Sequence, residues 1–218
     1  MLRRGQLLAL DGDAVELAAA GLVRLGVRQW REAEAVAEAW RIRADSFAGA
    51  WLDFGNAPAP DLRVPAGPVL RSVVHRAARL LLEVHDGDGP AVLEQLGLRA
   101  AQARDQARRT DEAHPGEPVA LALVWHDVQA LTAGDQQDHG RHIDDRCEAY
   151  IREGHQREDV LALIVASVRL AVEALAELSG RSAGRAAEQL DEHAARHMPR
   201  RGPAPLWVPG QPPQPAAG

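Results

Sequence analysis

The feature that most constrains the fold of this sequence is an apolar stripe between residues 30 and 54, which repeats in alternating steps of three and four. The chain has 5 Trp and 2 Phe, and the stripe contains three of the Trp and both Phe. Such spacing places its members on one side of an α-helix. They are Trp30, Ala33, Ala37, Trp40, Ala44, Phe47, Trp51 and Phe54. The stripe therefore predicts a long helix with one strongly apolar face.

This face has two interpretations. With Trp30 at heptad position a, the flanking positions include Val36, Ala48 and Ala50, whereas a self-sufficient coiled coil would carry complementary charges there. The widened apolar face favours a helix buried by several neighbours in a bundle core. The alternative is a dimerisation or partner surface, because burying five aromatic rings contributes on the order of 10 kcal/mol.

Helical periodicity and end signals predict six to seven helices and no strand. The first helix is expected to begin at Asp11 or Asp13 and to end near Gly26, and the aromatic helix to end at Gly55. Pro and Gly mark the ends of the others. These further helices are predicted at about 69–85, 90–107, 118–131, 159–178 and 182–198.

The predicted helix over 159–178 is apolar on almost every side, which is typical of a helix in the middle of a bundle. The length of 218 residues and a hydrophobic content of 46% suit one helical bundle domain over residues 1–200. Pro dominates after Gly202, and residues 201–218 are predicted to be a disordered tail. The predicted fold class is all-α, a bundle with a Pro-rich disordered C-terminal tail.

Composition argues against several partners. The formal net charge is −6 and no long basic run occurs, which argues against a nucleic-acid partner. The longest apolar run, 160–168, is far shorter than the roughly 20 residues that span a bilayer, so we expect no membrane association. Cys147 is the only cysteine, which excludes an intrachain disulfide and favours the cytoplasm.

The strongest candidate for chemistry is a cluster of Asp and His in the charged segment 135–154. If this segment is helical, Asp135, His139 and His142 stand at i, i+4 and i+7 on one face. Helical bundles build metal sites from carboxylates and imidazoles at such spacings. One interpretation of this cluster is a site for a divalent metal such as Zn or Mn. The alternative is a solvated acidic helix with surface histidines.

The single thiol is predicted to be a core residue. In a helix, Cys147 shares an apolar face with Ile143 and Tyr150. The neighbouring Asp144 and Glu148 are negative, and negative charge raises a thiol pKa, whereas a nucleophilic cysteine needs a lowered one. We therefore expect Cys147 to pack rather than to react.

Arg169 and Glu173 interrupt the most apolar predicted helix, at i and i+4. Residues at this spacing face each other on a helix surface and pair as opposite charges. One interpretation places the pair on the solvent-exposed edge of the helix. The other places it in the interior, where it lines a pocket.

The sequence leaves two function classes open. It contains no P-loop, dinucleotide fingerprint, nucleophile elbow or Cys-x-x-Cys pair. With so much packing surface, it favours a non-enzymatic protein–protein interaction or regulatory module that contacts a protein partner or itself through helix faces. The alternative is a metal-dependent helical-bundle enzyme, a hydrolase that uses the His/Asp cluster. No organic cofactor is predicted, and no catalytic residue is assigned.

Overall fold

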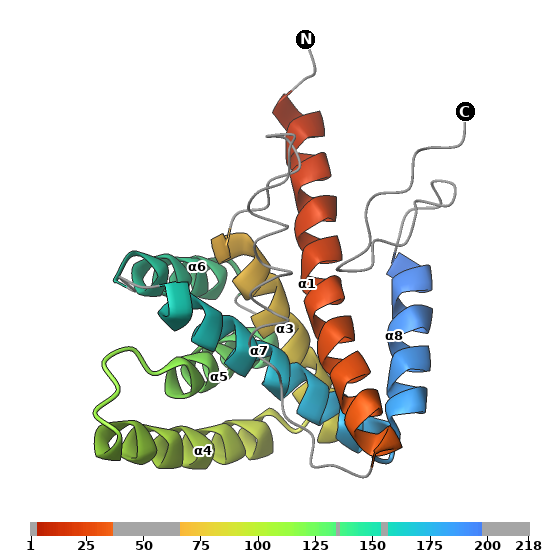
Figure 1. The fold of residues 1–218 in the computed structure, drawn as a ribbon. Helices are drawn as coiled ribbons and strands as arrows, with labels where there is room; N and C mark the ends of the chain where they lie inside the picture. The colour runs from red at the N-terminus through yellow and green to blue at the C-terminus, as the bar shows by residue number, and fades with distance from the viewer. Residues whose placement is uncertain (1–3, 37–65, 134–135, 154–156, 198–218) are drawn as a thin grey trace.

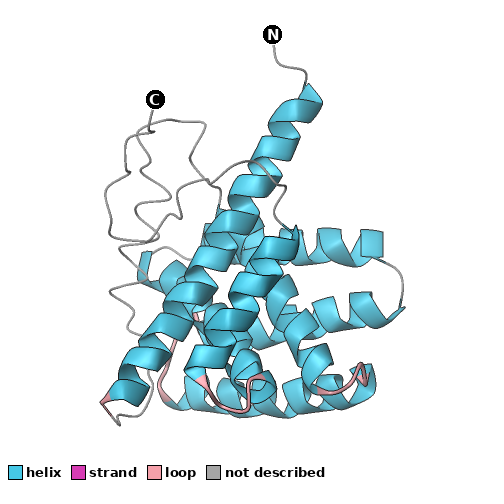
Figure 2. Ribbon diagram, turned by 90° about the vertical axis from the view of Figure 1, so that its right-hand side faces the viewer, coloured by secondary structure: helices cyan, strands magenta, loops and turns pink. Residues whose placement is uncertain are grey.

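The structure, a computed structural model, describes residues 4–36, 66–133, 136–153 and 157–197. Within these residues it describes no side chain of 4–14, 17, 66, 136–140, 157–158 or 191–197. The described part contains seven α-helices and no strand, which confirms the all-α prediction (Figures 1 and 2). The helices are α1 (Arg4–Ala35), α3 (Ala66–Val84), α4 (Gly89–Arg109), α5 (Gly116–Ala133), α6 (Gln136–Glu153), α7 (Arg157–Leu178) and α8 (Ala183–His197). The predicted tail and domain boundary at residue 200 lie outside the described residues.

Helix α7 packs against several other helices, as expected for a helix that is apolar on most sides. It packs against α3, α5, α1 and α8 (Figure 1). Leu163, Ile164 and Val168 are completely buried in it. Removing a Leu or Ile side chain of this size from water contributes about 1.5–3 kcal/mol, so α7 supplies much of the stabilisation of the fold.

Helix α1 differs from the prediction. It is continuous from Arg4 to Ala35, so the expected start at Asp11 or Asp13 and the break near Gly26 are wrong. A glycine inside a helix costs about 1 kcal/mol relative to alanine. Here Val23 and Val27, on either side of Gly26, are both buried in the core, and their packing outweighs that local cost.

The aromatic stripe is described only at its first positions. Trp30 is buried in the core of the bundle at the end of α1. The members from residue 37 onward lie outside the described residues. Trp30 therefore packs in the core. For the members from residue 37 onward, both the core and the interface interpretation stay predictions.

Gly116 lies where the start of α5 meets the backbone of α7. A Cβ atom built on Gly116 would lie 2.5 Å from the carbonyl carbon of Ala162 and 2.7 Å from the nitrogen of Leu163. These neighbours are backbone atoms and cannot rotate away. The absence of a side chain at Gly116 thus sets how closely α5 and α7 approach each other.

Helix α6 turns its apolar face to the core. Ile143, Cys147 and Tyr150 are all buried, as predicted. The hydroxyl of Tyr150 lies 2.9 Å from the carbonyl oxygen of His114 and 3.0 Å from that of Asp159, and donates its hydrogen to them. Burial, with the nearby negative charges of Asp159 and Glu112, raises the pKa of Tyr150 to about 12. The hydroxyl therefore stays protonated and joins α6 to the segments that precede α5 and begin α7.

None of the described helices combines the length and the apolar character needed to cross a lipid bilayer.

Candidate functional site

The most extensive group of polar contacts in the described part of the chain lies on α3. Four polar side chains of this helix contact carboxylates from three other helices. We call this group the α3 polar face. It consists of Arg71, Ser72, His75 and Arg76 with the partners Glu16, Asp127 and Asp144. Together these contacts join α3 to α1, α5 and α6.

Glu16 of α1 accepts two hydrogen bonds from this face. Ser72 Oγ donates to its Oε1 at 2.6 Å, and Arg76 Nη2 donates to its Oε2 at 2.6 Å. Burial raises the pKa of Glu16, but the hydrogen bond from Ser72 and the charge of Arg76 lower it more, with a contribution from His75. The net pKa of Glu16 lies below its ordinary value of 4.5.

We expect Glu16→Gln to destabilise the protein at neutral pH by up to about 1 kcal/mol, since more than half of the Glu16 side chain is exposed. A carboxyl with a lowered pKa stabilises the fold above its ordinary pKa, and this contribution is lost as the pH falls. The difference between the two proteins should therefore shrink as the pH drops below 4.5. Urea unfolding at a series of pH values measures it.

The matched control is Glu94→Gln, at an exposed carboxylate on α4, which should change stability by less than about 0.5 kcal/mol at any pH. A Glu16→Gln difference that stayed constant across the acid range would show that the charge of Glu16 has no stabilising role.

His75 of α3 forms a second junction, with Asp127 of α5. Its Nδ1 lies 2.9 Å from Oδ2 of Asp127, whose side chain is 11% exposed. A carboxylate at Nδ1 fixes the orientation of an imidazole, as in many general bases. Ser72, on the same helix, donates its hydroxyl hydrogen to Glu16. The imidazole is thus oriented by a carboxylate, and the hydroxyl of Ser72 points to Glu16 and not to His75.

Cys147 lies beneath the third junction. Arg71 Nη1 donates to Oδ2 of Asp144 at 2.8 Å, and both side chains are partly exposed. Burial and the negative charges of Asp144 and Glu148 raise the pKa of Cys147 to about 12, although Arg71 acts in the opposite direction. The predictions of a core position and a raised thiol pKa are both confirmed.

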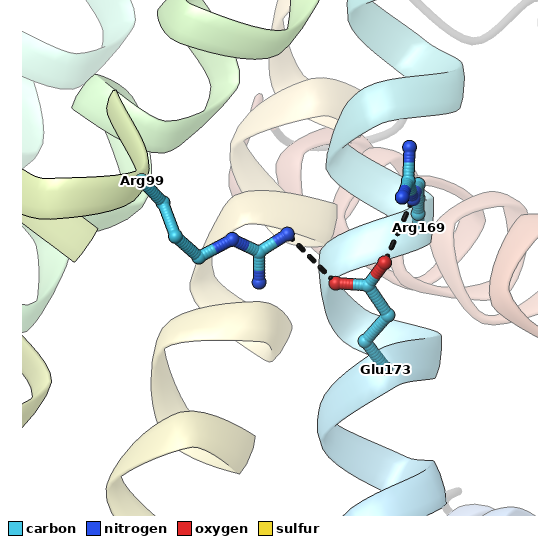
Figure 3. A network of polar contacts seen from close by, with 3 residues as sticks. All are labelled: Arg99, Arg169 and Glu173. Carbon is cyan, nitrogen blue, oxygen red and sulfur yellow. Dashed lines mark hydrogen bonds and ion pairs between the residues drawn. The ribbon is translucent and has the colours of Figure 1, made fainter. Parts of the chain in front are cut away.

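Glu173 of α7 bridges two arginines (Figure 3). It accepts from Arg169 Nε at 2.7 Å through Oε1 and from Arg99 Nη2 at 2.8 Å through Oε2. Half of the Arg169 side chain is exposed, so the pair lies on the solvent-accessible edge of α7. The sequence indicates the contact within α7, but it misses Arg99 of α4, which is 74 residues away.

The predicted metal ligands are only partly described. Asp135 lies outside the described residues, and His139 lies in α6 without a described side chain. His142 is exposed, and its ring contacts the ring of His126 of α5 with a centroid separation of 4.9 Å. No group of three or more His, Cys, Asp or Glu among the described side chains is arranged to hold a metal ion. The structure thus adds His126 as the neighbour of His142.

Sequence reasoning misses Glu16, His75 and Arg99 as members of polar contacts. One local signal exists, because Arg71 and His75 stand at i and i+4 on an otherwise apolar helix and mark a polar stripe. No local signal identifies their partners, which come from distant parts of the chain.

No protein-family model matches this chain, and neither a curated protein nor a solved structure is detectably similar to it. Its function must therefore be argued from its own residues.

Proposed function

We propose that this chain is a non-enzymatic protein–protein interaction module that pairs with a second copy of itself through the first turns of α1. The observation that carries the proposal is the position of these turns. They project beyond the other described helices in two perpendicular views (Figures 1 and 2). Helix α1 has 32 residues, and at 1.5 Å per residue it is about 48 Å long. The side chains of α1 that are described as buried all lie between Ala18 and Trp30.

The heptad register of α1 supports an apolar contact in the projecting part. Leu8, Val15 and Leu22 are spaced by seven residues and so share one side of the helix. Leu22 is completely buried and Val15 is partly buried against the core. The side of α1 that packs inside the bundle thus continues, in register, into the turns that project from it.

Charge complementarity favours a second copy as the partner. Arg4 and Asp11 lie on either side of Leu8, three residues away in one direction and four in the other by sequence number. In an antiparallel pair of α1 helices centred between Leu7 and Leu8, Arg4 of one copy faces Asp11 of the other. With Leu8, Val15 and Leu22 at heptad position a, Arg4 and Asp11 fall at position d of the same seam, where a pair of opposite charges sets the orientation of the two helices.

The test is the mass of the full chain in solution by light scattering during size-exclusion chromatography. We expect twice the chain mass of 23.5 kDa. Leu8→Glu should return the protein to the monomer mass with an unchanged circular dichroism spectrum. Leu98→Glu, at a leucine of α4 that is 63% exposed, is the matched control and should remain dimeric.

A reciprocal charge exchange tests the antiparallel arrangement. Arg4→Asp should weaken the dimer by repulsion from Asp11, and Arg4→Asp combined with Asp11→Arg should restore it. A monomer at every protein concentration, or a dimer that Leu8→Glu leaves intact, would contradict the proposal.

A second candidate function, a metal-dependent hydrolase, is favoured by one contact. His142, a predicted ligand, has a second imidazole beside it from another helix. A catalytic metal needs protein ligands and a coordination position that stays open to water. This function therefore requires first that the His126–His142 pair bind a metal ion.

A further inference from the structure

Two histidine rings from different helices meet where α5 packs against α6. The ring centroids of His126 and His142 are 4.9 Å apart, and the ring planes are inclined at 80°. The two helices are in direct contact along this junction. Neither histidine belongs to the α3 polar face, although Asp127, next to His126, is bound to His75.

The separation of the rings matches that of two imidazoles bound to one ion. A zinc–nitrogen bond of about 2.0–2.1 Å places the centre of an imidazole roughly 3.2 Å from the metal. Two such rings at a tetrahedral angle have centres about 5 Å apart. From this agreement we infer that α5 and α6 carry a binding site for a divalent transition-metal ion, with His126 and His142 as two of its ligands.

The surroundings of the pair suit such an ion. His142 is exposed, so an ion can enter from solvent and water can complete its coordination. The ring of His126 is partly buried and lies edge-on to Trp125, with centroids 5.1 Å apart, which holds it in place. Imidazole ligands select Zn, Cu or Ni over Mg and Ca. The sequence spacing adds His139, three residues before His142 on α6, as a candidate third ligand.

A metal-free explanation of the same contact exists, because edge-to-face aromatic pairs also pack at centroid distances of about 4.5–7 Å. The two explanations differ in what the protein does with added metal. A packing pair binds no ion, and a ligand pair binds one.

The test uses the full chain without an affinity tag, stripped with a chelator and titrated with Zn²⁺ against a chromogenic indicator. We expect one Zn²⁺ per chain and no displacement by Mg²⁺. His126→Ala and His142→Ala should each weaken binding by about tenfold or more, as even outer-shell changes cost roughly 10–100-fold. His139→Ala should weaken it as well. His85→Ala, at a histidine just after α3 that is bonded to Gln95 of α4, is the matched control and should bind as the wild type does.

The fluorescence of Trp125 tests independently where the metal ion binds. Cu²⁺ bound at His126 quenches the fluorescence of the adjacent indole, so Trp125→Phe should remove most of the quenching and leave Zn²⁺ binding intact. Retained one-to-one Zn²⁺ binding in the double variant His126→Ala/His142→Ala, with an unchanged circular dichroism spectrum, would overturn the inference. So would a wild-type protein that binds no Zn²⁺. Neither result depends on the self-association proposed for α1.

Discussion

Replacing Gly116 by alanine is expected to lower the free energy of unfolding by about 3 kcal/mol or more, at the upper end of overpacking effects. The new methyl group would lie 2.5 Å from the carbonyl carbon of Ala162 and 2.7 Å from its oxygen. Relief requires α5 and α7 to separate, and α7 also packs against α3, α1 and α8. Urea unfolding followed by circular dichroism measures the loss as a lower midpoint.

The matched control is Gly97→Ala. Gly97 lies within α4, and no heavy atom lies within 4 Å of the position that its Cβ would take. Alanine there should stabilise the protein by about 0.5–1 kcal/mol, because glycine loses more backbone entropy on folding. Equal effects at the two glycines would show that the close approach of α5 to α7 does not limit stability.

The thiol of Cys147 is expected to react with Ellman's reagent at least about a thousandfold more slowly in the native protein than after unfolding. Its pKa is raised from 9.0 to about 12 by burial and by neighbouring carboxylates. Below pH 9 such a thiol carries about a thousandth of the thiolate of an ordinary cysteine. Burial of the sulfur excludes the reagent as well. The measurement compares the rates before and after addition of guanidinium chloride.

The sign of the pH dependence follows from the direction of this shift. A thiol with a raised native pKa stabilises the fold below its ordinary pKa of 9.0, and the stability declines as the pH rises toward about 12. Leu98→Cys in a Cys147→Ala background provides an exposed control thiol, which should react at the rate of the unfolded chain. A native Cys147 that reacted as fast as this control would contradict the buried position.

Local signals predict the described helices well where Pro and Gly mark their ends. The start of α4 next to Pro90 and the end of α3 before Gly87 follow from such signals. Helices α3 and α5 begin two to three residues before the predicted positions, at Ala66 and Gly116. Proline is tolerated within the first turn of a helix, because its missing N–H would have no helical partner there.

Contacts between distant residues could not be predicted in the same way. The bond between His75 and Asp127 joins residues 52 positions apart, and the contact of Arg99 with Glu173 joins residues 74 apart. Their pairing depends on how whole helices pack. The continuity of α1 through Gly26 has the same origin, since burial of Val23 and Val27 outweighs the local preference of glycine.

The candidate metal ligands illustrate this limit. The spacing i, i+4 and i+7 applies to residues of a single helix, and it identifies Asp135, His139 and His142. It cannot find His126, which reaches His142 only because α5 packs against α6.

The hydroxyl of Tyr150 has a consequence for how the native protein opens. It bonds to carbonyl oxygens of His114 and Asp159, which belong to separate segments of the chain. A fluctuation that lifts α6 from the bundle must break these hydrogen bonds, at a cost of about 0.5–1.5 kcal/mol. Opening of α6 alone is therefore disfavoured. We therefore expect the helix and the two segments bound to Tyr150 to open together, so that their amide hydrogens exchange with similar protection.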